Sequence, residues 1–243
     1  MSGTRSSLNG VPLFALEAVS FAYAGKPVLF DGLDLALQQG EHIGLYGPNG
    51  SGKTTLFRLI MGLEKPLSGR LMLHGEPVDN DKALRALRCQ IGLVMQNADD
   101  QLFSPTVLDD VAFGPINLGL GRSAAKERAM QVLDNLGMGG FADRLTHRLS
   151  GGEKKLVSIA SVLSMRPEAL LLDEPTAFLD DDSRERIIGI LRGLSSARII
   201  ISHDRDFLER TSSLFTCIEH GKLTALSREL PLALNRIRSL PSA

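Results

Sequence analysis

The most informative segment of this chain is Gly47-Pro48-Asn49-Gly50-Ser51-Gly52-Lys53-Thr54-Thr55. It fits the pattern G-x-x-x-x-G-K-[ST], in which glycines allow backbone N–H groups to turn inward around phosphate oxygens. Residues 42–46 before it are mostly apolar and predict a buried parallel strand, whereas residues 55–61 after it predict the start of a helix. The helix dipole adds positive potential at the point where the loop ends. The chain is therefore predicted to bind a nucleoside triphosphate through residues 47–55.

Two side chains of this loop have expected roles. Lys53 would reach the β- and γ-phosphates, and the Thr54 hydroxyl would ligate Mg²⁺. A plain glycine-rich turn is the alternative interpretation, and the flanking strand and helix argue against it.

Composition limits the class of protein. A chain of 243 residues is long enough for one large α/β domain, or for one domain with a modest subdomain. The net charge of −1 indicates no overall basic field, so nucleic acid is not expected as a partner.

Residues 1–10 lack a signal-peptide core and no apolar run approaches the roughly 20 residues of a membrane helix, so we expect a cytoplasmic protein. Cys89 and Cys217 are isolated and suggest neither a zinc site nor a disulfide.

The remaining sequence predicts further strands and helices around the loop. Strands are expected at residues 13–23, 28–37, 70–73, 91–95, 169–173, 198–202 and in a last hairpin within 214–225. Helices are expected at residues 107–117, 124–136 and 183–194. We predict a single nucleotide-binding domain at about 11–228, with a helical subdomain at about 97–165 and a C-terminal tail at 229–243.

A second candidate site follows the apolar strand Leu170-Leu171-Leu172, which delivers Asp173 and Glu174 at its polar end. Asp173 can hold a metal ion through its water shell, and Glu174 can orient or deprotonate an attacking water. Two adjacent acids after a strand are often only a solvated strand end. The phosphate loop favours the functional interpretation.

A third candidate site is Leu149-Ser150-Gly151-Gly152-Glu153, a turn that opens a helix continuing through Leu163. Its exposed N–H groups would form a second anion site, although a simple helix N-cap is the alternative. One fold rarely needs two such sites for one triphosphate. This turn is therefore expected to complete the site of another subunit.

These motifs, in this order, resemble the nucleotide-binding subunit of an ATP-binding cassette (ABC) transporter, over residues of about 13–226. The resemblance implies an α/β fold with a P-loop ATPase core, in which a mixed sheet is flanked by helices, together with an antiparallel β subdomain and an α-helical signature subdomain. It implies ATP and Mg²⁺ as cofactors, hydrolysis of ATP, and two subunits that close head to tail around two ATP molecules. A homodimer fits the complete set of motifs, and a heterodimer with a paralogue remains open.

The resemblance also assigns roles to single residues. Tyr23 matches the aromatic that stacks on adenine, and Gln96 matches the residue that senses Mg²⁺ and the attacking water. Ser150, Gly151 and Gly152 match the signature that meets the γ-phosphate of the opposing subunit. Asp173 matches the metal ligand and Glu174 the catalytic carboxylate. Asp180 matches the dimer-contact loop, and His203 matches the switch histidine on the γ-phosphate. Taken alone, Tyr23 could be a core aromatic, Gln96 a surface amide and His203 a helix cap.

The segment 96–107, followed by 110–115, resembles the energy-coupling-factor branch of the family, most of all the cobalt and nickel importers, with vitamin importers next. There it lines the groove for a coupling helix of the transmembrane subunit, which would place this chain peripherally on the cytoplasmic side of the cell membrane. Leu102, Phe103 and Val107 would form the floor of the groove, and Asp99, Asp100 and Gln101 its rim. An acidic loop that caps the next helix is the alternative.

Several positions depart from the family pattern: Glu153 replaces a usual Gln, Ala98 a common Pro and Phe178 a usual Gly, and the spacing from Asp180 to His203 is 23 (203 − 180). None removes a catalytic group. The five histidines are scattered and show no ligand spacing, so cargo selection is expected in membrane subunits.

Three other functions remain as alternatives. A soluble cassette ATPase acting on ribosomes or DNA would usually have two cassettes or a long inserted arm. A kinase with the same loop would not need the signature, Asp180 and His203 together. A conventional importer or exporter subunit is disfavoured by residues 99–105.

Overall fold

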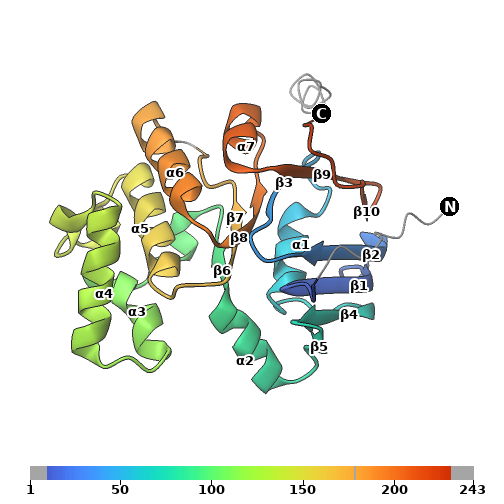
Figure 1. Ribbon diagram of the computed structural model, residues 1–243, viewed down its shortest axis with the longest axis horizontal. Helices are drawn as coiled ribbons and strands as arrows, with labels where there is room; N and C mark the ends of the chain where they lie inside the picture. The colour runs from blue at the N-terminus through green and yellow to red at the C-terminus, as the bar shows by residue number, and fades with distance from the viewer. Residues whose placement is uncertain (1–9, 178, 231–243) are drawn as a thin grey trace.

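The computed structural model describes residues 10–177 and 179–230 (Figure 1). Phe178 and most of the predicted tail lie outside the described residues. The predicted α/β class is confirmed, because a mixed central sheet is flanked by helices on both faces. Figure 1 places α3, α4 and α5 together at one end of the molecule and the sheet of β1, β2, β4 and β5 at the other.

The central sheet has six strands in the order β10-β9-β3-β8-β7-β6. Neighbours from β9 to β6 run parallel, and the short β10 pairs antiparallel with β9. The strands are β3 (His42–Tyr46), β6 (Ile91–Val94), β7 (Ala169–Asp173), β8 (Ala197–Ile201), β9 (Leu214–Glu219) and β10 (Lys222–Leu223). Nearly continuous apolar runs form these strands because both faces of a parallel sheet are buried.

The smaller sheet is antiparallel, with the order β2-β1-β4-β5. It contains β1 (Phe14–Phe21), β2 (Phe30–Leu37), β4 (Ser68–Leu73) and β5 (Glu76–Pro77). The predicted hairpin is confirmed, since β1 and β2 pair with Phe14 opposite Leu37 and Phe21 opposite Phe30.

Seven helices are present in the described part of the chain. They are α1 (Lys53–Ile60), α2 (Asp81–Gln90), α3 (Val107–Asn117), α4 (Arg122–Asn135), α5 (Gly151–Leu163), α6 (Asp181–Gly193) and α7 (Arg205–Thr211), with short 3₁₀ turns at 98–100, 139–141 and 146–148. The sequence did not predict α2 or α7. Charged and polar residues make up half of α2, and only Leu87 in this helix is fully buried.

Alternate residues of the central strands build two cores. Leu171 and Ile199 point to the face that packs against α1 and the antiparallel sheet, whereas Leu170 and Ile200 point to the face that packs against α3, α5 and α6. This alternation follows from the period of two along a strand. The helix α1 is thereby held between the two sheets, and its N-terminus lies at the carboxyl end of β3.

Candidate nucleotide site

A cleft of about 790 Å³ lies at the carboxyl edge of the central sheet. Parallel strands all deliver their following loops to this edge, which is where ligands bind in such sheets. Residues predicted as contacts line much of the cleft: Tyr23, Asn49, Gly50, Gly52, Lys53, Thr54, Thr55, Gln96, Asp173, Glu174 and His203. Folding therefore brings five separate segments of the sequence to one cavity.

The phosphate loop is tightly built. Gly52 has φ 99°, and a Cβ atom there would lie 2.7 Å from the Phe30 ring, so only glycine fits. Lys53 is buried, and its Nζ donates to the carbonyls of Gly47 at 2.8 Å and Pro48 at 3.0 Å. Burial lowers the pKa of Lys53, and the carboxylates of Glu174 and Asp173 oppose that change. An ammonium and the N-terminus of α1 thus meet at the same point, which suits a polyphosphate.

The side chains that are predicted to hold Mg²⁺ present oxygen atoms to the cleft. The Thr54 hydroxyl donates to Oδ2 of Asp173 at 2.8 Å, and the Asp173 side chain is buried at the end of β7. Burial raises the pKa of Asp173, although the Thr54 hydroxyl opposes it. Gln96 faces the same cleft from the end of β6. Hydroxyl, carboxylate and amide oxygens are the ligands that Mg²⁺ prefers, so the residues present fit this ion.

Glu174 is held in an uncommon backbone conformation, with φ 46°. Its N–H donates to the carbonyl of Ile201 at 3.0 Å, and its Oε1 lies 3.5 Å from Nε2 of His203. Burial raises the pKa of Glu174 to about 7, against the opposing effect of the His203 main-chain N–H. A carboxyl group with such a pKa can accept a proton near neutral pH. Strained backbone of this kind is typical of functional sites.

Tyr23 lies at the wall of the cleft rather than in the core. Its side chain is 38% exposed, its hydroxyl lies 3.1 Å from Oγ1 of Thr55, and its ring meets Phe21 edge to face. The position is compatible with a planar base resting beside the ring.

The signature turn and Asp180 lie outside this cleft. Ser150 caps α5 through a capping box with Glu153, whose carboxylate also lies 3.5 Å from Arg144. Asp180 caps α6, and a Cβ atom at Gly152 would lie 3.1 Å from Oγ of Ser183 in the first turn of that helix. The two segments are therefore neighbours on a surface away from the chain's own phosphate loop.

Lys155 is a residue that the sequence reasoning missed. Its side chain is buried, and its Nζ donates to the carbonyls of Met95 at 2.8 Å and Gln96 at 2.6 Å. Burial lowers the pKa of Lys155 to about 8, and the carboxylate of Asp173 opposes that change. The helix that begins with the signature is thereby fastened to the segment that holds Gln96. The sequence held no clear signal, because Lys155 directly follows Glu153 and Lys154 and precedes the apolar part of α5.

The segment 96–107 differs in part from the predicted groove. Gln101 is partly exposed, and its side chain accepts from the Met95 N–H and donates to the Ser158 carbonyl, both at 3.0 Å. Val107 is fully buried in the core rather than at a groove floor. The exposed apolar group is instead Phe103 with Phe113, which meet edge to face and are 65% and 45% exposed. Of the predicted rim, Asp99 pairs with Lys154, and Asp100 is exposed.

Two general properties bear on the class of protein. None of the helices within residues 10–177 and 179–230 is long and apolar enough to cross a membrane. In the same part of the chain, His, Cys, Asp and Glu side chains form no group of three or more that could hold a metal ion.

Comparisons with known proteins agree on a family. Residues 30–177 match the model described as ABC transporter. A putative ABC transporter ATP-binding protein of Nitratidesulfovibrio vulgaris is 54% identical, covering 91% of this chain and 81% of the relative. An energy-coupling factor transporter ATP-binding protein of Methanothermobacter thermautotrophicus is 42% identical, covering 88% and 70%. A nickel import ATP-binding protein of Rhodobacter capsulatus is 43% identical, covering 88% of each.

A solved structure has the same fold. It is cbiO1 from Clostridium perfringens, described as part of the ABC transporter complex cbiONQ, and it is 33% identical with a TM-score of 0.79 over 89% of this chain and 88% of that one. With the phosphate loop, the paired carboxylates and the signature turn in one fold, the chain belongs to the ABC transporter family and is an ATP-binding subunit that hydrolyses ATP.

Proposed function

We propose that this chain energises an energy-coupling-factor importer, with cobalt or nickel ions as the cargo and a vitamin as the alternative. The observation that carries the proposal is the exposed pair of Phe103 and Phe113, with the exposed acidic residues Asp99 and Asp100 shortly before Phe103 in the chain. Exposed aromatics next to charge are typical of a site that receives an amphipathic helix. The names of the relatives from Methanothermobacter and Rhodobacter support the same branch.

In the cleft, we assign the binding of ATP to residues 47–55 and Tyr23. Lys53 and the N–H groups of the loop would hold the β- and γ-phosphates, and the Tyr23 ring would stack on adenine. Thr54, Asp173 and Gln96 would hold Mg²⁺, which supplies positive charge to the triphosphate when bound.

Hydrolysis then depends on two side chains of the cleft. Glu174 accepts a proton from the attacking water, whose oxygen bonds to the γ-phosphorus while the bond to the bridging oxygen of ADP breaks. His203 contacts the γ-phosphate and keeps it in line with the water. The pKa of Glu174, about 7, suits a group that must be free to accept this proton at neutral pH.

The signature turn and Asp180 are assigned to the site of a second subunit. Ser150, Gly151 and Gly152 lie outside the chain's own cleft, so a head-to-tail dimer would bring the N-terminus of α5 to the partner's γ-phosphate. A second copy of this chain would complete both sites, and a paralogue is the alternative. Loss of the γ-phosphate removes the shared anion, which lets the dimer open and moves the membrane partners.

The proposed sites can be assigned to parts of the domain. Residues of about 11–228 form one ATP-binding domain, in which the helical part at about 97–165 carries both the signature and the Phe103–Phe113 pair. Through this pair the chain would bind transmembrane subunits and lie peripherally on the cytoplasmic face of the membrane.

The experiment is affinity purification of tagged Glu174→Gln protein from detergent-solubilised membranes of the native host with ATP present, followed by mass spectrometry. We expect polytopic subunits of a metal importer to be recovered. Recovery of ribosomal or purely soluble partners would contradict transport and leave the ATPase chemistry intact. Vesicles that contain the same subunits together with the unsubstituted chain should accumulate Co²⁺ or Ni²⁺ with ATP. Uptake of a vitamin, with accumulation of neither ion, would mean that the cargo is a vitamin instead.

A matched pair of substitutions tests the docking surface. Phe103→Ser should lose the membrane subunits in this purification and keep its affinity for ATP. Leu67→Ser is the control, because Leu67 is 68% exposed and Phe103 65%, on another part of the surface. Equal recovery of membrane subunits with both variants would contradict the assigned surface.

A further inference from the structure

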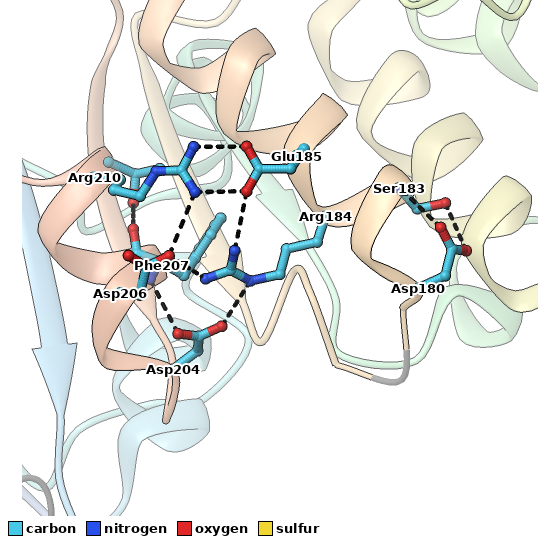
Figure 2. Close-up of polar contacts among 9 residues, drawn as sticks. Asp180, Ser183, Arg184, Glu185, Asp204, Asp206, Phe207 and Arg210 are labelled. Carbon is cyan, nitrogen blue, oxygen red and sulfur yellow. Dashed lines mark hydrogen bonds and ion pairs between the residues drawn. The ribbon is translucent and has the colours of Figure 1, made fainter.

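Helices α6 and α7 are joined by a group of alternating charges, which Figure 2 shows. The group consists of Arg184 and Glu185 on α6, Asp206 and Arg210 on α7, and Asp204, which precedes α7. Two arginines thus face three carboxylates. Networks of this kind stabilise more than isolated surface pairs, because each side chain is restrained by several partners.

Arg184 lies at the centre of the group. Its Nε donates to Oδ2 of Asp204 at 2.8 Å, and its Nη2 donates to Oδ2 of Asp206 at 2.6 Å. The side chain is only 19% exposed. The hydrogen bonds that Arg184 donates to the two carboxylates raise the pKa of Arg184, while burial opposes the rise. The guanidinium fork therefore fixes the position of Asp204 from the side of α6.

Asp204 is restrained at three atoms. Its Oδ2 accepts from Arg184, its Oδ1 accepts from the Phe207 N–H at 3.0 Å as the cap of α7, and its N–H donates to Oγ of the buried Ser202 at 3.0 Å. His203 stands between Ser202 and Asp204 and lines the cleft. The main chain of His203 is consequently held from both sides, and Arg184 supplies the restraint that comes from another element.

The other end of this connection is Asp180. Its carboxylate accepts from the N–H and the hydroxyl of Ser183 at 2.8 and 2.9 Å, and its carbonyl accepts from the Arg184 N–H at 3.0 Å. Asp180 and Arg184 are thus parts of one helical turn (Figure 2). A displacement of that turn would move the guanidinium and, with it, Asp204.

We propose that Arg184 is a positioning residue for ATP hydrolysis, which ties the Asp180 turn of α6 to Asp204 and thereby sets the position of His203 in the cleft. The inference rests on the proposed contact of His203 with the γ-phosphate. It adds a route between subunits: a partner that docks on the Asp180 turn would change the rate of hydrolysis in the cleft of the chain that carries this turn. Small displacements suffice, since a misplacement of about 1 Å can lower a rate about a hundredfold.

The competing explanation is that Arg184 only fastens α6 to α7, and Arg210 provides the matched control. Arg210 makes a two-pronged contact with Glu185 and a longer one with Asp206, so it joins the same two helices without touching Asp204. If Arg184 only held the two helices together, substitution of Arg184 and substitution of Arg210 should have the same effect on kcat.

The experiment measures steady-state ATPase of the full chain for Arg184→Met and Arg210→Met, with unfolding temperature and ATP affinity beside it. We expect Arg184→Met to lower kcat at least about tenfold with KM for ATP changed less than about threefold, and Arg210→Met to change kcat less than about twofold. Equal losses of kcat for the two variants would overturn the inference. Should Arg184→Met fail to fold, Arg184→Lys and Arg210→Lys are compared in the same way, and only the first should slow turnover.

A double substitution separates this inference from the function on which it rests. With His203→Ala as the background, Arg184→Met should cause no further loss, because its effect passes through His203. If Arg184→Met lowered kcat by the same factor with and without His203→Ala, the inference about Arg184 would be overturned. The proposed role of His203 would not be affected by that result. A normal rate for His203→Ala itself would instead contradict the proposed role of His203.

Discussion

Charged side chains have different surroundings at the two edges of the central sheet. At the carboxyl edge, Lys53, Asp173 and Glu174 surround an open cleft of about 790 Å³. At the amino edge, Arg198 is buried, and its partners within the described residues are the carbonyls of Thr211, Leu191 and Leu194 and Nδ1 of His42. Burial lowers the pKa of Arg198 to about 10.

The difference follows from the direction of the chain. Helices that return against parallel strands bring their N-termini to the carboxyl edge and their C-termini to the amino edge. The carbonyls at the ends of α6 and α7 therefore surround the Arg198 cation, whereas the start of α1 adds positive potential to the cleft. The charge at the amino edge is satisfied by internal hydrogen-bond partners, whereas the charges at the carboxyl edge face an open cleft.

The largest effect should come from the carboxyl edge. Glu174→Gln keeps the size of the side chain and removes the proposed proton acceptor, so kcat should fall about a thousandfold, which corresponds to a rise of about 4 kcal/mol in the activation free energy. ATP binding should persist and a closed dimer should accumulate, measured by gel filtration with ATP. Rapid hydrolysis by this variant would contradict the role of Glu174.

The second effect concerns the amino edge. Arg198→Met should destabilise the protein by about 2–3 kcal/mol, because three helix-terminal carbonyls lose a donor in a buried site. The urea midpoint measures this loss. ATP affinity of the folded protein should change less than about threefold; a large loss of affinity with an unchanged midpoint would mean that the two edges are not separate in function.

A smaller effect is expected where α5 meets Gln96. Lys155→Met should lower kcat about tenfold, since the carbonyls of Met95 and Gln96 lose their donor and the Gln96 side chain is displaced. Lys154→Met is the matched control, because Lys154 directly precedes Lys155 and pairs with the exposed Asp99. Similar rates for the two variants would remove Lys155 from the set of functional residues.

The smallest effect is a pH dependence at the amino edge. Burial lowers the pKa of His42, with a further contribution from the Arg198 cation. The folded state therefore binds the proton less readily than the unfolded chain, and stability should fall as the pH drops below the ordinary value of 6.5 towards the folded pKa. Urea midpoints between pH 5 and pH 8 measure this slope, and His42→Gln should reduce it. An identical slope in the variant would assign the acid sensitivity to other groups.

The parts of the fold that were predicted correctly carry local signals. The hairpin of β1 and β2, the strand β7 and the helix α5 each show strong periodicity or a turn at the expected residues. The helix α7 was missed because it is only seven residues long, and its start depends on Asp204 as a cap. The prediction of Val107 as a groove residue was wrong, because exposure is decided by packing rather than by residue type.

By itself, the sequence determined the chemistry and the family. A phosphate loop, two acids after an apolar strand and a Ser-Gly-Gly turn are short segments whose residues act together through neighbouring backbone. Only the tertiary structure decided which partners act over long separations: Lys155 reaches Met95 and Gln96, Arg184 reaches Asp204, and Arg198 reaches His42. Such contacts depend on how helices pack on the sheet, and no short stretch of residues contains that information.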